Sequence, residues 1–324
     1  MKLCRLRWLG ILAAIVLLAG CGGGGDAATG DRLLVVATTG QVADLVRHVG
    51  GERVAVTALM GPGVDPHLYK ASAGDVERLR QADIIFYNGL HLEAKMGDVL
   101  RHMGRRQPTF AVAETLDEDR LLSPPGYEQA HDPHVWFDVS LWRRTIEPVA
   151  ARLAELDPEH AAGFQQRAAA YAQELDELHA FATERFATIP ADQRVIVTAH
   201  DAFNYLGRAY GLEVRGLQGI STATEAGTGD VQDLAAFIAG RRIPAIFVET
   251  SVSPRAIEAV REAVRSRGWQ VEVGGSVYSD ALGDSGTPAG TYVGMVRHNV
   301  ETITRALRGE VDPGEVDPGE VGHE

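Results

Sequence analysis

Residues 157–189 read DPEHAAGFQQRAAAYAQELDELHAFATERFATI and carry the most regular helical pattern in the chain. Their apolar side chains recur at alternating spacings of three and four, which places them on one face of a helix: Ala161, Phe164, Ala168, Tyr171, Leu175, Leu178 and Ala182. Asp157 suits the N-cap of this helix, and Pro158 suits its first turn. A helix of roughly 30 residues is roughly 45 Å long. We therefore expect a rigid connector that packs against two lobes; the alternative is a long helix that belongs to one lobe only.

Short apolar and β-branched runs alternate with helical patterns on both sides of this connector. The expected strands are Leu33 to Thr38, Val54 to Met60, Ile84 to Tyr87 and Thr109 to Val112, then Val195 to Ala199, Glu213 to Leu217, Ala245 to Glu249 and Val271 to Val273. The helical patterns of the second half lie near residues 202–210, 231–241, 254–267 and 292–307. Such alternation is typical of α/β folds. We predict an N-terminal α/β lobe over residues 32–156, a connecting helix over 157–190 and a C-terminal α/β lobe over 191–308.

The first 20 residues have the layout of a secretory signal, with a basic start, an apolar stretch and a run of small residues. Leu18-Ala19-Gly20-Cys21 matches the bacterial lipobox, in which the cysteine is acylated and becomes the new N-terminus. The apolar stretch is shorter than the about 20 residues of a membrane-spanning helix. We predict a signal peptide over residues 1–20, a lipid anchor on Cys21 and a flexible tether over 21–31. The protein is then expected in the bacterial cell envelope, on the periplasmic or extracellular face of the cytoplasmic membrane, with the lipid as its membrane contact.

Composition excludes several classes of function. The chain has two cysteines, and Cys4 leaves with the signal peptide, so a disulfide and a thiolate metal site are excluded in the mature monomer. The formal net charge of -13 argues against a nucleic-acid partner and favours the approach of cations. Nothing in the sequence requires an oligomer, and we expect a monomer.

The C-terminal residues 309–324 repeat Gly-Glu-Val-Asp-Pro twice and begin a third copy. Low complexity, acidic charge and regularly spaced proline prevent a packed core, so this tail is expected to be disordered. The alternative is an acidic metal-scavenging tail that includes His323.

Two copies of the tripeptide Asp-Pro-His lie in the first half of the chain, where they end in His67 and His134. The second half contributes His200, in a Thr-Ala-His turn, and Asp280, in a Gly-rich loop. Each of the four follows a strand-like or loop segment, at the edge where open α/β sheets bind ligands. Structural zinc knots take ligands from pairs a few residues apart, whereas these residues lie about 65 to 80 residues apart. The set therefore predicts one divalent-metal site that only the complete fold assembles.

Other residues near these four compete for the same roles. A single histidine among the 11 in the chain is more often a surface or hydrogen-bonded residue than a ligand. His131 lies three residues before His134, and Asp284 lies four residues after Asp280. Glu249, at the end of an apolar strand, is a candidate for orienting the His200 imidazole, because ligating imidazoles usually donate their other N–H. A plain carboxylate at the end of a strand explains Glu249 equally well.

Four segments resemble the ligand motifs of the metal-binding lipoproteins of ABC importers, the TroA-like manganese/zinc family: Gly63 to His67, Asp132 to Trp136, Thr198 to Phe203 and Gly274 to Asp280. Residues 216–222 and 290–295 also resemble that subgroup, and the likeness covers essentially residues 33–307. The resemblance implies two lobes of parallel sheet with flanking helices, joined by one rigid helix. It also implies a divalent ion in the interlobe cleft, bound by His67, His134, His200 and Asp280 and delivered to a membrane permease.

The ligand set leaves the metal open. Three imidazoles and one carboxylate suit Zn²⁺ in a tetrahedral site, whereas a bidentate Asp280 makes five contacts and accommodates Mn²⁺ or Fe²⁺. Many zinc-dedicated relatives carry a long loop rich in histidine and acids in the first lobe, but residues 114–131 are short and contain one histidine. This favours a manganese or mixed manganese/zinc importer.

Because imidazole must lose its proton to ligate, affinity is expected to fall below pH about 6.5.

Two other classes of function remain as alternatives. A secreted zinc hydrolase also uses histidines and an acid, but a catalytic zinc keeps one position open for water and needs a general base. The chain contains no His-Glu-x-x-His, Gly-x-Ser-x-Gly or Walker motif. A surface adhesin is the second alternative, because a lipid-anchored protein is displayed on the envelope. We expect a binding protein and not an enzyme.

Overall fold

The computed structural model describes residues 32–123 and 130–309. From Arg32 onward these residues form one compact unit. The predicted signal peptide, the lipid anchor on Cys21, the tether and all of the predicted tail except Gly309 lie outside the described residues. In the described ranges, no helix combines the length and the apolar character needed to cross a membrane.

The first half of the described chain forms one parallel sheet with the strand order β2-β1-β3-β4. Its strands are β1 (Leu33–Ala37), β2 (Val54–Ala58), β3 (Ile84–Tyr87) and β4 (Thr109–Ala111), and its helices are α1 (Gly40–Gly50), α2 (Ala73–Gln81), α3 (Gly97–Met103), α4 (Val139–Trp142) and α5 (Ile146–Leu156). In β1, Val35 faces one apolar cluster and Val36 faces another. Both faces of the sheet are therefore covered, as parallel sheets require. We call these elements the N-terminal lobe.

The second half is built from two parallel strand pairs, β5 with β6 and β7 with β8. These strands are β5 (Val195–His200), β6 (Glu213–Gln218), β7 (Ala245–Glu249) and β8 (Glu272–Val277), and the helices are α7 (Asn204–Tyr210), α8 (Thr228–Arg241), α9 (Arg255–Arg265) and α10 (Tyr292–Ala306). Because β5 contacts β7, the strands follow the order β6-β5-β7-β8, which repeats the order of the first sheet. We call these elements the C-terminal lobe. The α/β class with parallel sheets and flanking helices is as predicted.

The last strand lies further along the chain than the sequence predicts. The expected strand ends at Val273, because Gly274 and Gly275 are turn signals, but β8 runs through both glycines. A Cβ atom on Gly274 would lie 2.6 Å from the Cβ atom of Ala306, so glycine allows α10 to pack directly on the strand. Gly275 has a φ of +128°, a conformation that other residues rarely adopt.

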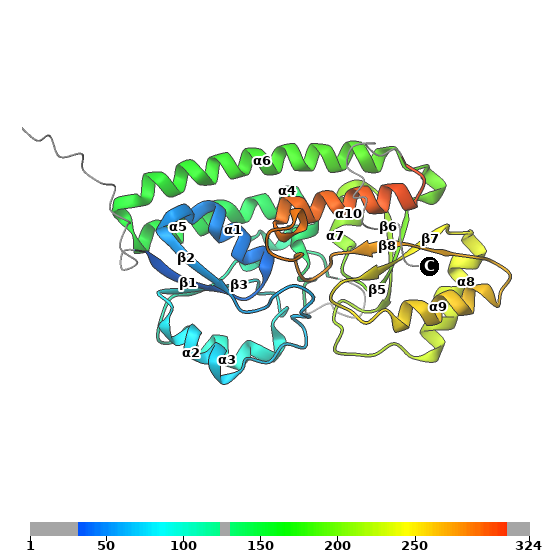
Figure 1. Ribbon diagram of the computed structural model, residues 1–324, viewed down its shortest axis with the longest axis horizontal. Helices are drawn as coiled ribbons and strands as arrows, with labels where there is room; N and C mark the ends of the chain where they lie inside the picture. The colour runs from blue at the N-terminus through cyan, green and yellow to red at the C-terminus, as the bar shows by residue number, and fades with distance from the viewer. Residues whose placement is uncertain (1–31, 124–129, 310–324) are drawn as a thin grey trace, which may run out of the picture. The chain divides into compact units, whose positions relative to one another are not determined.

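The predicted connector is α6 (Ala161–Ala187), a helix of 27 residues and so about 40 Å long. It contacts α1, α4 and α5 of the N-terminal lobe and α7 and α10 of the C-terminal lobe (Figure 1). Its buried stripe consists of Phe164, Ala168, Tyr171, Leu175, Leu178, Ala182 and Phe186. That stripe belongs to an apolar core that continues from one lobe into the other. Of the two alternatives, the helix that packs against both lobes is therefore correct.

The start of this helix differs from the prediction. A short 3₁₀ turn, Pro158–His160, precedes α6, and Asp157, at the N-cap position of this turn, makes no capping hydrogen bond with its side chain. The Asp157 carboxylate is engaged elsewhere: its Oδ1 lies 2.8 Å from Nδ1 of His160, and its Oδ2 accepts a hydrogen bond of 3.1 Å from Nε of Arg53. The predicted cap is wrong because both oxygens already have side-chain partners.

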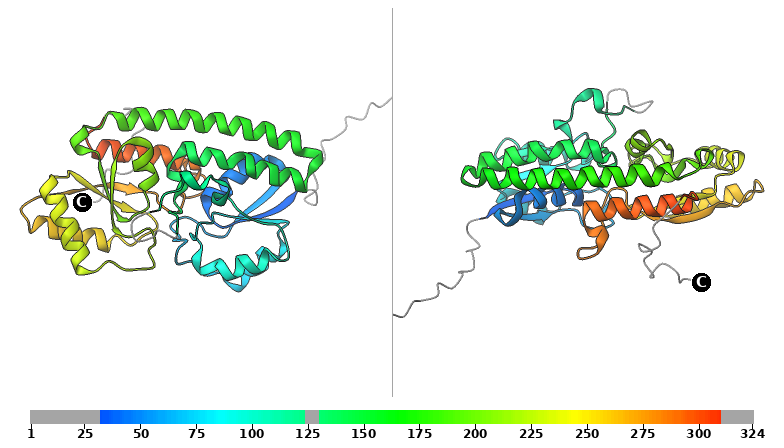
Figure 2. Two further views of the ribbon diagram at one scale, coloured as in Figure 1. Left: turned by 180° about the vertical axis from the view of Figure 1, so that it is seen from behind. Right: turned by 90° about the horizontal axis from the view of Figure 1, so that it is seen from above.

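A second helix, α10, also contacts both lobes, although the sequence pattern assigns it to the C-terminal lobe alone. It packs on β8 and lies beside α6 and α1 (Figure 2). At its first residue, the backbone N–H of Tyr292 donates to Oδ2 of Asp44 in α1 at 3.1 Å. The Tyr292 hydroxyl donates to the backbone oxygen of Trp136 at 2.6 Å. These bonds add a second set of contacts between the lobes to those made by the connector α6.

Candidate metal centre

The structure brings together all four residues that the sequence singles out. His67 lies in the loop after β2, His134 in the loop between β4 and α4, His200 at the end of β5, and Asp280 in the loop after β8. One nitrogen or oxygen atom from each side chain lies within 4.8 Å of those of the other three, and all four residues are buried. Each lobe supplies two of them. We refer to these four residues, which could hold one metal ion, as the metal centre.

The separations in the metal centre fit a single ion. Nε2 of His67 lies 3.3 Å from Nε2 of His134. The two oxygens of Asp280 each lie 3.4 Å from an imidazole Nε2, one from that of His134 and the other from that of His200. A tetrahedral ion with bonds of about 2.1 Å separates its ligand atoms by about 3.4 Å. Because both oxygens of Asp280 face imidazoles, a five-contact arrangement is equally available, so these distances admit both Zn²⁺ and Mn²⁺.

Two carboxylates lie against the outer nitrogens of the imidazoles. Oδ1 of Asp132 lies 2.7 Å from Nδ1 of His134, and Oε2 of Glu249 lies 2.6 Å from Nδ1 of His200. Each contact directs Nε2 of its ring towards the metal centre and makes that nitrogen a better ligand. Glu249 reaches His200 because it ends β7, the strand next to β5.

Sequence reasoning proposes Glu249 for this role but overlooks Asp132. A local signal for Asp132 was available, because an aspartate at the start of a turn commonly accepts the backbone N–H two residues later. Oδ1 of Asp132 accepts that bond from the N–H of His134 at 3.0 Å. The backbone bond holds the carboxylate where it also meets the ring.

The three histidines of the metal centre differ in their pKa values. Burial lowers the pKa of His67 to about 3. Burial also disfavours the charged form of His134, but Asp132 and Asp280 outweigh it and raise the pKa of His134 to about 9. In the same way Glu249 and Asp280 raise the pKa of His200 well above its usual value. Burial would raise the pKa of Asp280, yet His200 and His134 hold that pKa well below its usual value. An ion held by these imidazoles would therefore displace protons from His134 and His200.

The ligand-bearing loops of the two lobes are also bonded to each other. The indole Nε1 of Trp136 donates to the backbone oxygen of Ser279 at 3.1 Å, one residue before Asp280. The same indole lies edge-on to the His134 ring, with centroids 5.3 Å apart. This bond fixes the Asp280 loop relative to the His134 loop, and no pattern in the sequence indicates it.

The two competing residues lie outside the metal centre. The His131 side chain is 29% exposed, and its Nδ1 lies 3.1 Å from Oγ of Ser123. Asp284 is exposed to solvent beyond the buried loop that carries Asp280. Neither belongs to the group of converging ligand atoms.

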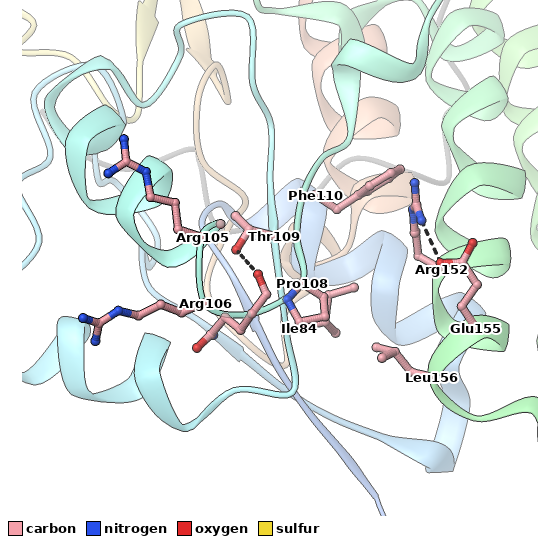
Figure 3. Close-up of a pocket in the computed structure, with 11 residues that line it drawn as sticks. Ile84, Arg105, Arg106, Pro108, Thr109, Phe110, Arg152, Glu155 and Leu156 are labelled. Carbon is pink, nitrogen blue, oxygen red and sulfur yellow. Dashed lines mark hydrogen bonds and ion pairs between the residues drawn. The ribbon is translucent and has the colours of Figure 1, made fainter.

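A cavity of about 580 Å³ lies far from this chemistry. It is found where β3 and β4 begin, lined by Ile84 and Thr109 (Figure 3). The loops of the metal centre follow the opposite, carboxyl ends of the strands. Arg105 and Arg106 line its rim, but their guanidinium groups point away from the other lining residues (Figure 3). On the far side Arg152 is paired with a glutamate of its own helix at 2.7 Å. The charged groups do not converge, so the cavity has no clear binding chemistry.

Comparisons with known proteins agree with the geometry. The family model described as zinc-uptake complex component A, periplasmic, matches residues 35–306. The chain is 52% identical over 285 residues to the zinc-binding protein TroA of Treponema pallidum, covering 88% of this chain and 92% of that protein. It is 46% identical over 304 residues to the manganese-binding lipoprotein MntA of Bacillus subtilis, covering 92% and 99%. A solved structure of the periplasmic zinc-binding protein TroA matches with a TM-score of 0.83, covering 85% of this chain and 99% of that one.

Proposed function

The chain belongs to the family of the periplasmic zinc-uptake complex component A, and from this membership we propose that it captures a divalent transition metal outside the cytoplasm and delivers it to an ABC permease for import. Members of this family are solute-binding components of metal importers, not enzymes. The observation that carries the proposal is the convergence of His67, His134, His200 and Asp280 within 4.8 Å in a buried site. The family supports neither the hydrolase nor the adhesin alternative.

The proposed cargo is Mn²⁺, Zn²⁺ or both. One of the relatives is named for zinc binding and another for manganese binding, and the chain resembles both over most of its length. By the Irving–Williams order, an isolated site of these ligands holds Zn²⁺ more tightly than Mn²⁺. Affinity in solution therefore does not identify the cargo, and uptake by cells does.

The proposed organisation follows the predicted boundaries. The N-terminal lobe spans residues 32–156, the connector 157–190 and the C-terminal lobe 191–308. We propose that residues 1–20 are removed as a signal peptide and that Cys21 carries the lipid that anchors a monomer through the tether at 21–31. Export is supported because the matching family is described as periplasmic. The anchor is supported because the MntA protein of Bacillus subtilis is named a lipoprotein.

Uptake by cells tests the proposed function. In metal-limited medium, a strain that lacks this chain is expected to accumulate less Mn²⁺ or Zn²⁺ than its parent, as measured by elemental analysis. The wild-type gene restores uptake, whereas a His134→Ala variant, expressed to the same level, does not. A Cys21→Ser variant is expected in the soluble fraction of the envelope instead of the membrane fraction. Unchanged contents of both metals after deletion would show that the chain is not the capturing component.

The pH dependence of metal binding follows from the shifted pKa values. A metal binds neutral imidazole, so protons on His134 and His200 compete with it, whereas His67, with a pKa of about 3, is already neutral. Affinity is expected to rise with pH through neutrality towards about 9, by about tenfold per pH unit for each proton displaced. The sequence alone predicts the loss only below about 6.5. The buried carboxylates raise the pKa values of His134 and His200, so the loss of affinity is expected at higher pH.

Chelator competition between pH 6 and 9 measures this dependence. Calorimetry in buffers of different ionisation enthalpy measures the protons released, and about two per ion are expected at pH 7. An affinity that is constant between pH 7 and 8.5, with no proton release, would contradict the assignment.

A further inference from the structure

Both Asp-Pro-His turns use one carboxylate oxygen in the same way. In the first turn, Oδ1 of Asp65 accepts the backbone N–H of His67 at 2.8 Å. In the second, Oδ1 of Asp132 accepts the backbone N–H of His134 at 3.0 Å. Each aspartate therefore sets the conformation of the turn that carries its histidine.

The second oxygen of each aspartate reaches the opposite lobe. Oδ2 of Asp65 accepts a hydrogen bond of 2.5 Å from the Thr222 hydroxyl, in the loop after β6. Oδ2 of Asp132 accepts a hydrogen bond of 3.1 Å from the side-chain amide of Asn204, at the start of α7. Each of these two carboxylates thus joins its histidine-bearing turn in the N-terminal lobe to a residue of the C-terminal lobe.

The bond between Thr222 and Asp65 has the larger consequence for its histidine. Asp132 also contacts the ring of His134, so that ring has a direct support within its own turn. Asp65 reaches His67 through the backbone N–H, so the position of this imidazole depends on the conformation of the turn. Thr222 is itself buried and Asp65 is half-buried, so the bond is only partly open to competing water.

We propose that Thr222 is a positioning residue for metal capture and release: its hydrogen bond to Asp65 latches the C-terminal lobe onto the turn that carries His67. The inference rests on the proposed function. While the lobes are in contact, the latch holds the imidazole against the ion. When the lobes part, the bond breaks, the turn is free to move, and His67 leaves the ion first. A hydrogen bond to a charged acceptor is among the stronger ones, so it slows this opening.

Removal of the hydroxyl tests the latch. Thr222→Val keeps the shape of the side chain and is expected to release Zn²⁺ on the order of tenfold faster, with little change in the rate of association. Thr222→Ser restores the hydroxyl and is expected to release Zn²⁺ near the wild-type rate. Thr224→Val is the matched control, because Thr224 is exposed in the same loop. Rates are measured by mixing zinc-loaded protein with an excess of a chromogenic chelator.

A second variant changes the acceptor of the same hydrogen bond. Asp65→Asn weakens the acceptor and is also expected to speed release. The double variant Asp65→Asn with Thr222→Val is expected to release no faster than the faster single variant, because both remove one bond. Melting curves of the metal-free variants confirm that each is folded.

The possible results are distinguishable. A wild-type protein that retains no Zn²⁺ or Mn²⁺ overturns the proposed function and the latch with it. Wild-type binding together with a wild-type release rate in Thr222→Val overturns the latch alone. Release from Thr222→Ser as fast as from Thr222→Val also overturns it, because the hydroxyl would then not be the cause.

Discussion

Alanine in place of His67, His134, His200 or Asp280 is expected to weaken the binding of Zn²⁺ and Mn²⁺ by more than about a hundredfold, because loss of a supporting outer partner alone costs 10–100-fold. The four donor atoms converge within 4.8 Å, so each replacement removes one contact that no other residue of the metal centre supplies. Calorimetric titration of each variant measures the loss. Far-UV circular dichroism checks that the helices are retained.

Two matched controls come from the sequence itself. His131→Ala and Asp284→Ala replace residues of the same types, close in sequence to two of the ligands but outside the metal centre. Both are expected to bind metal with wild-type affinity. A wild-type affinity in any of the four ligand variants removes that residue from the ligand set.

Replacement of Glu249 by glutamine is expected to lower metal affinity by about 10–100-fold, although Glu249 is not expected to touch the ion. Its Oε2 lies 2.6 Å from Nδ1 of His200, where a negative charge makes the ring a stronger ligand. Glutamine keeps the shape and removes the charge, so the pKa of His200 falls towards its usual value. Fewer protons are then released on binding at pH 7, which the buffer series described above detects.

The control for this replacement is Glu258→Gln, an exposed glutamate in α9. It removes the same charge from the surface and is expected to leave affinity and proton release unchanged. If Glu249→Gln binds like the wild type, Glu249 is only a carboxylate at the end of a strand, which is the other explanation that the sequence allows.

The charged groups of the metal centre lie in contact with one another. Three carboxylates, those of Asp132, Glu249 and Asp280, contact the rings of His134 and His200. With both rings protonated, two positive charges face three negative ones. A divalent ion that displaces two protons leaves this balance unchanged. The metal-free protein is therefore expected to remain folded, unlike a zinc finger.

Much of the fold follows from local patterns. The buried stripe of α6 shows directly in the three- and four-residue spacing of its apolar side chains. Strands such as β3 are short apolar runs between turn signals, and they lie where the pattern places them. Two residues of the metal centre, His67 and His134, are also locally marked, since an Asp-Pro-His turn is recognisable without knowledge of its surroundings.

The features that the sequence could not indicate depend on contacts between distant residues. Asp157 is a good cap by type, but Arg53 lies more than 100 residues away and takes one of its oxygens. Similarly, Gly274 is a turn signal by residue type, but in the structure it lies in a strand and allows α10 to pack closely on it. The hydrogen bonds from Thr222 to Asp65 and from Asn204 to Asp132 join opposite lobes, and no local sequence pattern predicts them.

Anomalous scattering from crystals grown with Zn²⁺, with data collected above and below the zinc absorption edge, locates the bound ion. Ligation by the metal centre predicts one strong zinc peak, surrounded by Nε2 of His67, His134 and His200 and by the carboxylate of Asp280. A zinc peak bound by other residues, with none between these four side chains, would contradict it.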